Sequence, residues 1–246
     1  MGVIIWYIIS SSSISIMKNN ISEINKIEYL TQEYFDKGKT KLALKTYRTL
    51  LDLYPKHISF YVNYIHFLEE EIVIAELLQN AYHEIIACCE QAIKIFQENE
   101  LEYFYLKKLE IYIILIDGSF AKWYYEYEYK VEHYVHEVYQ RYSNRIEALK
   151  RIMALYRLIG NTTKEKEVLD LAYNLDSDDY MIILRKVGFL QASEENIAAT
   201  EVLENWILHN PTSSYLNIAY QKAHSLYTKI EDQDKIDFYQ DLIDNK

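Results

Sequence analysis

Glycine and proline are scarce in this chain, with five glycines and two prolines among 246 residues. A β-sandwich or β-barrel needs many tight turns, which are built largely from these two residues, so the composition excludes folds of that kind. Long helices joined by short loops need few of either residue. No alternation of apolar and polar residues bounded by turn residues indicates a strand. We therefore expect an all-α protein.

Cysteine and positive charge are also in short supply. The two cysteines, Cys88 and Cys89, are adjacent, and neighbours on a helix point about 100° apart, so they do not pair readily with each other or form a CxxC metal motif. The chain has 26 basic and 37 acidic residues and a net charge of −11, which opposes binding to nucleic-acid phosphates and anionic membranes. We expect inert, buried thiols, no nucleic-acid partner and a cytoplasmic location.

Residues 1–16 form an apolar, serine-rich leader with no preceding basic residue and no small-x-small cleavage site. The apolar run is too short to span a bilayer, so we expect no stable membrane insertion. Three interpretations stay open. The leader is outside the fold, with a domain over 17–246 and translation from Met1 or Met17. Otherwise it is a weak signal that makes the protein exported, or a segment that docks on the domain.

A spaced set of small and apolar residues occupies the stretch EYFDKGKTKLALKTYRTLLDLYP, residues 33–55. The set consists of Gly38, Ala43, Tyr47, Leu50 and Pro55. It resembles the tetratricopeptide repeat (TPR), a 34-residue helix–turn–helix unit with such residues at positions 15, 20, 24, 27 and 32. The glycine permits the turn between the helices, the alanine lets them approach closely, and the proline ends the second helix.

The same register recurs near the C-terminus. Pro211 takes position 32 of a second match, with Ala199 at position 20, and Gly160 falls at position 15 one period earlier. Two residues depart from the pattern, because Glu165 replaces the small residue at position 20 and Glu194 replaces the turn glycine. The resemblance implies a right-handed α-solenoid of about six antiparallel helix pairs, a TPR-like superhelix. We place the pairs near 21–54, 57–97, 99–142, 143–175, 178–209 and 212–245.

Residues 120–142, FAKWYYEYEYKVEHYVHEVYQRY, are rich in tyrosine and carry two stripes at helical spacing. The first stripe is predicted to face the core and contains Phe120, Tyr124, Tyr127, Val131, Tyr134 and Val138. The second is predicted to line a groove and contains Tyr125, Tyr129, His133 and His136. No Glu-x-x-His motif ends at either histidine, so we expect partly exposed structural histidines and no metal site.

No sequence motif indicates catalysis. The chain lacks GxxxxGK[ST], GxGxxG and GxSxG, and the acidic stretch DSDDYM at 176–181 is predicted to cap a helix start. We therefore expect a protein that is not an enzyme and that has no cofactor.

The resemblance implies a partner-binding surface on the concave side, lined by positions 2, 5, 9 and 12 of each first helix. Counted from Gly160, these are Glu147, Lys150, Ala154 and Arg157, and Arg185 falls near the same face. The implied function is a protein- or peptide-binding module or scaffold.

We hypothesise that Lys150, Arg157 and Arg185 hold an acidic segment or a terminal carboxylate of the partner. The alternative is that these cations only balance nearby acids on a solvated face. A second function stays open, a regulatory or sensing protein that binds a small ligand or signalling peptide. A closed aromatic cavity around Tyr125 and Tyr129 would favour it.

Overall fold

The computed structural model describes residues 26–27, 29–31, 33–34, 36–74, 78–117 and 121–244, without the side chains of 40, 71–74, 78–80 and 121–128. These residues form helices and turns, and no strand occurs among them, so the expected all-α class is confirmed. Residues 1–16 lie outside the described part, so the three interpretations of the leader stay predictions. Where the chain is described, no helix combines the length and apolar character needed to cross a membrane.

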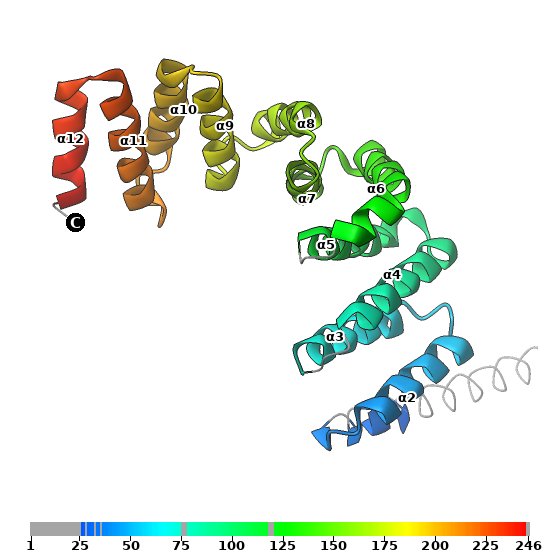
Figure 1. The fold of residues 1–246 in the computed structure, drawn as a ribbon. Coiled ribbons are helices and arrows are strands. Elements are labelled where there is room, and N and C mark those ends of the chain that lie inside the picture. Colours follow the sequence, from blue (N-terminus) through cyan, green and yellow to red (C-terminus); the bar gives the residue numbers. More distant parts are fainter. Residues whose placement is uncertain are drawn as a thin grey trace, which may run out of the picture. The chain divides into compact units, whose positions relative to one another are not determined.

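Helical residues between 26 and 36 precede α2, and the later helices follow one another with short connections (Figure 1). Each predicted range from 57–97 onward contains two α-helices, so the expected positions of these helices are confirmed, while a stack of antiparallel pairs stays a prediction. The elements are α2 (Thr40–Leu53), α3 (Ile58–Ile74), α4 (Leu78–Ile95), the 3-10 helix η1 (Glu98–Glu100), α5 (Glu102–Asp117), α6 (Ala121–Tyr142), α7 (Ile146–Leu158), α8 (Thr162–Leu175), α9 (Tyr180–Ala192), α10 (Asn196–His209), α11 (Leu216–Ile230) and α12 (Gln233–Asp244).

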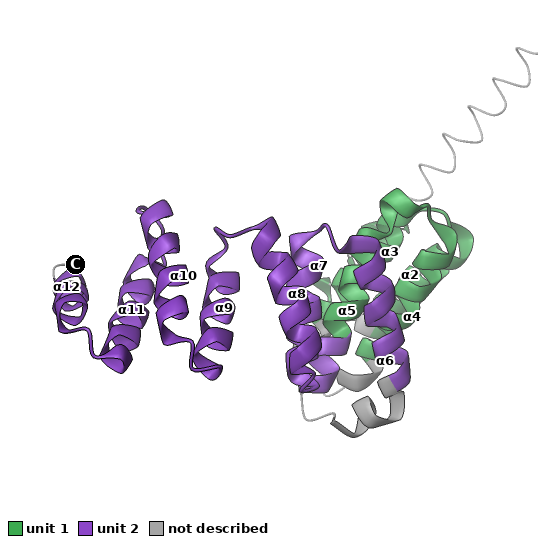
Figure 2. Ribbon diagram, turned by 90° about the horizontal axis from the view of Figure 1, so that it is seen from above, with its two compact units in different colours: residues 1–111 green, residues 112–246 purple. Residues whose placement is uncertain are grey.

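The chain divides into two compact units, Met1–Ile111 and Tyr112–Lys246, with the boundary inside α5 (Figure 2). In the first unit α3 packs against α2 and α4. In the second unit, contacts link each helix from α6 to α12 with the next one in sequence. The expectation of a single solenoid domain over 17–246 stays a prediction.

In the first unit the repeat positions behave as their residue types require. Ala43 and Leu50 are fully buried on α2. The Tyr47 ring lies 5.7 Å from the Tyr64 ring and 5.4 Å from the Phe67 ring, measured between centroids. An alanine with no exposed surface allows α2 to approach its neighbours closely.

Four turns between helices share one backbone geometry. Their central residues have positive φ angles of 58–72° and are Gly38, Gly160, Glu194 and Glu231. In each turn the following amide donates to the carbonyl five residues before it, over 2.8–3.2 Å. This bond belongs to the Schellman motif that commonly ends helices. Gly160 and Glu194 lie 34 residues apart, so the turn repeats with the expected period even where glutamate replaces glycine.

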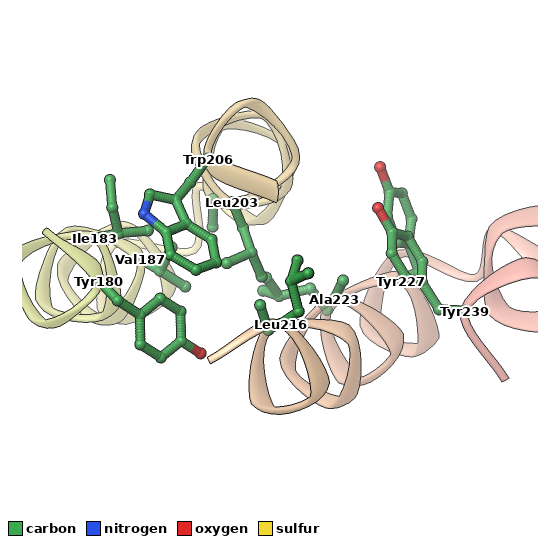
Figure 3. Packing of buried hydrophobic residues seen from close by; sticks show 12 residues of the cluster. Tyr180, Ile183, Val187, Leu203, Trp206, Leu216, Ala223, Tyr227 and Tyr239 are labelled. Atoms are coloured by element: carbon green, nitrogen blue, oxygen red, sulfur yellow. The ribbon is translucent and has the colours of Figure 1, made fainter. Parts of the chain in front are cut away.

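The core of the second unit is built from successive helices (Figure 3). Ala199 and Leu203 on α10 have no exposed surface. The Trp206 ring packs against Tyr180 of α9 at 4.6 Å between centroids, and its indole nitrogen donates to the Asp178 carbonyl over 2.7 Å. Tyr227 of α11 stacks on Tyr239 of α12 at 5.7 Å. Aromatic side chains therefore connect consecutive helices, and the Trp206 indole nitrogen is satisfied while the buried Tyr180 hydroxyl has no hydrogen-bond partner among the described residues.

The tyrosine-rich helix α6 buries one stripe. Val131, Tyr134 and Val138 are buried, as predicted. Phe120 and the side chains of Tyr124 and Tyr127 lie outside the described part.

The second stripe of α6 is solvent-exposed where it is described. Tyr129 is 81% exposed and stacks on the exposed His133, with 6.3 Å between ring centroids. His136 is also exposed. The Tyr125 side chain lies outside the described part. The described residues therefore do not enclose Tyr129 in a cavity, and the predicted groove-lining role of this stripe stays a prediction.

Candidate partner-binding groove

A groove of about 270 Å³ lies between α7 and α9, with α8 contributing one residue. It brings together the three cations that the sequence singled out, Lys150, Arg157 and Arg185. The α7 wall repeats at i, i+3, i+4 and i+7, the spacing of one helical face. The complete lining is Lys150, Met153, Ala154, Arg157, Glu165, Met181, Ile182 and Arg185.

The start of α9 is fixed by the acidic run that was predicted to cap a helix. The Asp179 side chain accepts hydrogen bonds from the amides of Met181 at 2.9 Å and Ile182 at 3.3 Å. Asp176 in turn accepts from the amides of Asp178 and Asp179, each at 3.1 Å. The predicted capping role is confirmed, and it places Met181 at the edge of the groove.

Arg185 is held by Glu165 in a two-pronged ion pair. Its Nε and Nη2 atoms donate to the two carboxylate oxygens over 2.5 and 2.6 Å. The Glu165 side chain is 3% exposed and that of Arg185 32%. The guanidinium also lies 4.7 Å from the centre of the Phe189 ring. The fork that could receive a partner's carboxylate is thus occupied by a residue of the same chain.

This pair gives a physical reason for the glutamate at position 20 of the predicted repeat. A charged residue at a small, buried position needs a compensating charge, and Arg185 supplies it from the next helix. The sequence contained both residues but gave no distance between them. The sequence did place a glutamate where the predicted repeat has a small, buried residue, with an arginine twenty residues later. This spacing alone could not predict the ion pair, because it does not show how α8 and α9 pack.

Lys150 is also paired within the chain. Its ammonium group contacts the Asp179 carboxylate and lies 3.3 Å from Glu147. The hydrogen bond to Asp179 raises the pKa of Lys150 above its ordinary value. Partial burial opposes ionisation of Asp179, but Lys150 and the Ile182 and Met181 amides outweigh it, so the pKa of Asp179 is lowered. Lys150 and Arg185 therefore form ion pairs with acids of the same chain, as the alternative interpretation of these cations predicted.

Arg157 differs from the other two cations. Its side chain is exposed and makes no ion pair with any residue that the structure describes. Beside it, Met153 is 7% exposed and Met181 is 60% exposed. The groove thus offers a partner apolar, adaptable surface and an unpaired guanidinium.

The described part of the first unit contains a smaller polar cluster and two buried cysteines. In the first unit Tyr64, Arg48 and Glu84 bond to one another beside a cavity of about 150 Å³. Cys88 borders this cavity, but its side chain is buried, and burial raises the pKa of its thiol to about 12. The expectation of buried cysteines is confirmed, since Cys89 is buried as well, and a thiol with a raised pKa is expected to be a poor nucleophile at neutral pH. Among the described side chains, no three His, Cys, Asp or Glu residues converge as metal ligands.

Comparison of the chain with protein-family models and with curated proteins finds no match. The contacts described above define an all-helical protein whose second unit carries a small groove between two alternate helices.

Proposed function

We propose that the protein is a non-enzymatic binding module or scaffold, a TPR-like right-handed solenoid whose concave face binds an extended segment of a partner protein. The observation that carries the proposal is the α7 wall of the groove. Lys150, Ala154 and Arg157 occupy three of the four positions that the resemblance assigns to the concave face, and all three line one cavity. Extended segments are commonly bound by stacked helical hairpins on that side.

The chemistry of the groove favours a partner with an acidic side chain or a terminal carboxylate next to an apolar residue. Arg157 donates two parallel hydrogen bonds to the carboxylate, the geometry that a guanidinium fork provides. Met153 and Met181 contact the apolar residue and adapt to its shape. Lys150 and Arg185 add positive potential while they hold the groove walls through Asp179 and Glu165. The net charge of −11 disfavours nucleic acid as the partner.

The proposal is tested with an array of synthetic acidic peptides, each made with a free and an amidated C-terminus. Peptides that bind the wild-type chain are titrated against Arg157→Glu and, as the matched control, against Lys166→Glu. Lys166 is an exposed cation of α8 outside this groove. We expect Arg157→Glu to weaken binding well over tenfold and Lys166→Glu to leave it unchanged, with equal helicity by circular dichroism. Equal binding by all three proteins would contradict the proposed site.

A further inference from the structure

A second groove, of about 640 Å³, lies between α10 and α12 over one residue of α11. It shares no residue with the groove between α7 and α9. Its lining consists of Glu201, Glu204, Asn205, Ile207, Leu208, Tyr220, Lys235, Phe238, Tyr239 and Leu242.

The two walls of this groove are equivalent faces of two helices. Residues 201, 204, 205 and 208 of α10 and residues 235, 238, 239 and 242 of α12 all line it. Each α12 residue lies 34 positions after its α10 counterpart. Both sets follow the i, i+3, i+4, i+7 spacing of one helical face, and each wall extends about 10 Å along its helix.

Polar contacts join the two walls of the groove, and large apolar side chains line it beside these contacts. Lys235 bonds to Glu204 over 2.6 Å, and the Tyr239 hydroxyl donates to the same carboxylate over 3.0 Å. Leu208, near the C-terminal end of α10, is 75% exposed, and Phe238, in the middle of α12, is 52% exposed. Two large apolar side chains on facing walls, fixed in position by a bridge between the helices, form a surface that gains free energy when covered.

The negative charge around the groove favours a positively charged partner. Helices α10 and α12 together carry six carboxylates, two on α10 and four on α12, against a single lysine. Glu201 borders the groove, is exposed, and forms no ion pair within the described part of the chain. A cationic partner is attracted by this field, and an anionic one is repelled.

We infer that the groove between α10 and α12 binds an amphipathic α-helix of a partner protein that carries lysine or arginine beside its apolar face. Leucine-type side chains of the partner at i, i+3/i+4 and i+7 contact Leu208 and Phe238 over two turns, which matches the length of the walls. Cations on its flank then face Glu201 and the aspartates of α12. This interaction is independent of the acidic segment proposed for the groove between α7 and α9.

The test uses three synthetic helical peptides with one fluorescent label. The first has leucines on one face and lysines on its flanks, the second has the same composition with the leucines spread around the helix, and the third replaces each lysine with glutamate. We expect the first peptide to bind the full chain saturably and the other two at least tenfold more weakly.

Aspartate substitutions separate groove binding from general attraction between opposite charges. Leu208→Asp and Phe238→Asp each add a negative charge, which strengthens attraction of a basic peptide, but each removes an apolar contact. The matched control Ile197→Asp adds the same charge to α10 at a 66%-exposed residue outside the groove. We expect the two groove variants to lose on the order of tenfold in affinity, while Ile197→Asp and Arg157→Glu retain or exceed wild-type binding.

Three outcomes overturn the inference. One is equal binding of the first two peptides, and another is unchanged binding by Leu208→Asp. The third is a concentration-dependent dimer that Leu208→Asp abolishes while the first peptide does not bind, which would assign the groove to a second copy of the chain.

Discussion

Replacing Arg185 with methionine is expected to destabilise the second unit strongly, because it leaves the Glu165 carboxylate without its partner. That carboxylate is 3% exposed and receives both prongs of the guanidinium over 2.5 and 2.6 Å. Removing one partner of a buried ion pair costs about 3–5 kcal/mol of folding free energy. Since Arg185 is itself 32% exposed, water enters its place more easily, and we expect a value near the lower end, about 3 kcal/mol.

The matched variants are Glu165→Ala, which restores a small residue at position 20, and the double variant Glu165→Ala with Arg185→Met. The double variant removes both charges, so we expect it to be more stable than Arg185→Met alone, by about 2 kcal/mol. Urea unfolding is followed by Trp206 fluorescence in a background where Trp6 and Trp123 are phenylalanine. Trp206 bonds to the segment that precedes α9, so it reports on the affected region.

Two results would refute this reasoning. Arg185→Met could cost less than about 1 kcal/mol, which is typical of a solvent-exposed pair. Alternatively, the double variant could be as unstable as the single one, which would show that the loss comes from the contact of the guanidinium with the Phe189 ring rather than from the uncompensated carboxylate.

Two further predictions concern a turn and an acid-sensitive contact. Gly160→Ala should lower the free energy of unfolding by about 1 kcal/mol, because the φ angle of this residue is +72°, although an added Cβ would meet no atom within 4 Å. Glu194→Gly changes a turn with the same geometry and should not destabilise the protein. A loss of stability of Glu194→Gly in urea unfolding would contradict the argument from backbone strain. Lys150 and the helix amides outweigh partial burial and lower the pKa of Asp179, so this contact stabilises the fold above the ordinary carboxyl pKa and is lost as the pH falls through the lowered value. Lys150→Met should therefore be less stable than wild type at pH 7, with the difference closing in acid, and a constant difference across a pH series of urea titrations would exclude the linkage.

The positions of the helices could be predicted from the sequence because they depend on local signals. Gly38 and Gly160 occupy the turn position of the predicted repeat, and both have the left-handed backbone that a turn of this kind requires. The same register placed Lys150 and Arg157 on one face of a helix, and both line one groove. Periodicity within a helix and a residue's backbone preference need no knowledge of neighbouring helices.

The remaining features depend on contacts between helices that sequence spacing does not encode. Arg185 was expected to receive a partner, but the packing of α9 on α8 brings it to Glu165. Tyr129 was predicted to line a groove, but it is 81% exposed and lines neither of the grooves described above. The groove between α10 and α12 was not predicted, because the sequence does not show that α12 lies close enough to α10 for Lys235 and Tyr239 to bond to Glu204.

The shared geometry of the four turns affects how such hairpins can be recognised. A sequence profile that rewards glycine at the turn counts Glu194 and Glu231 as mismatches, although their φ angles, 63° and 58°, lie close to those of the two glycines. A left-handed residue other than glycine costs roughly 1–2 kcal/mol, which a hairpin with a well-packed core can tolerate. The residues that identify a helical hairpin can therefore be lost one by one while its backbone remains the same.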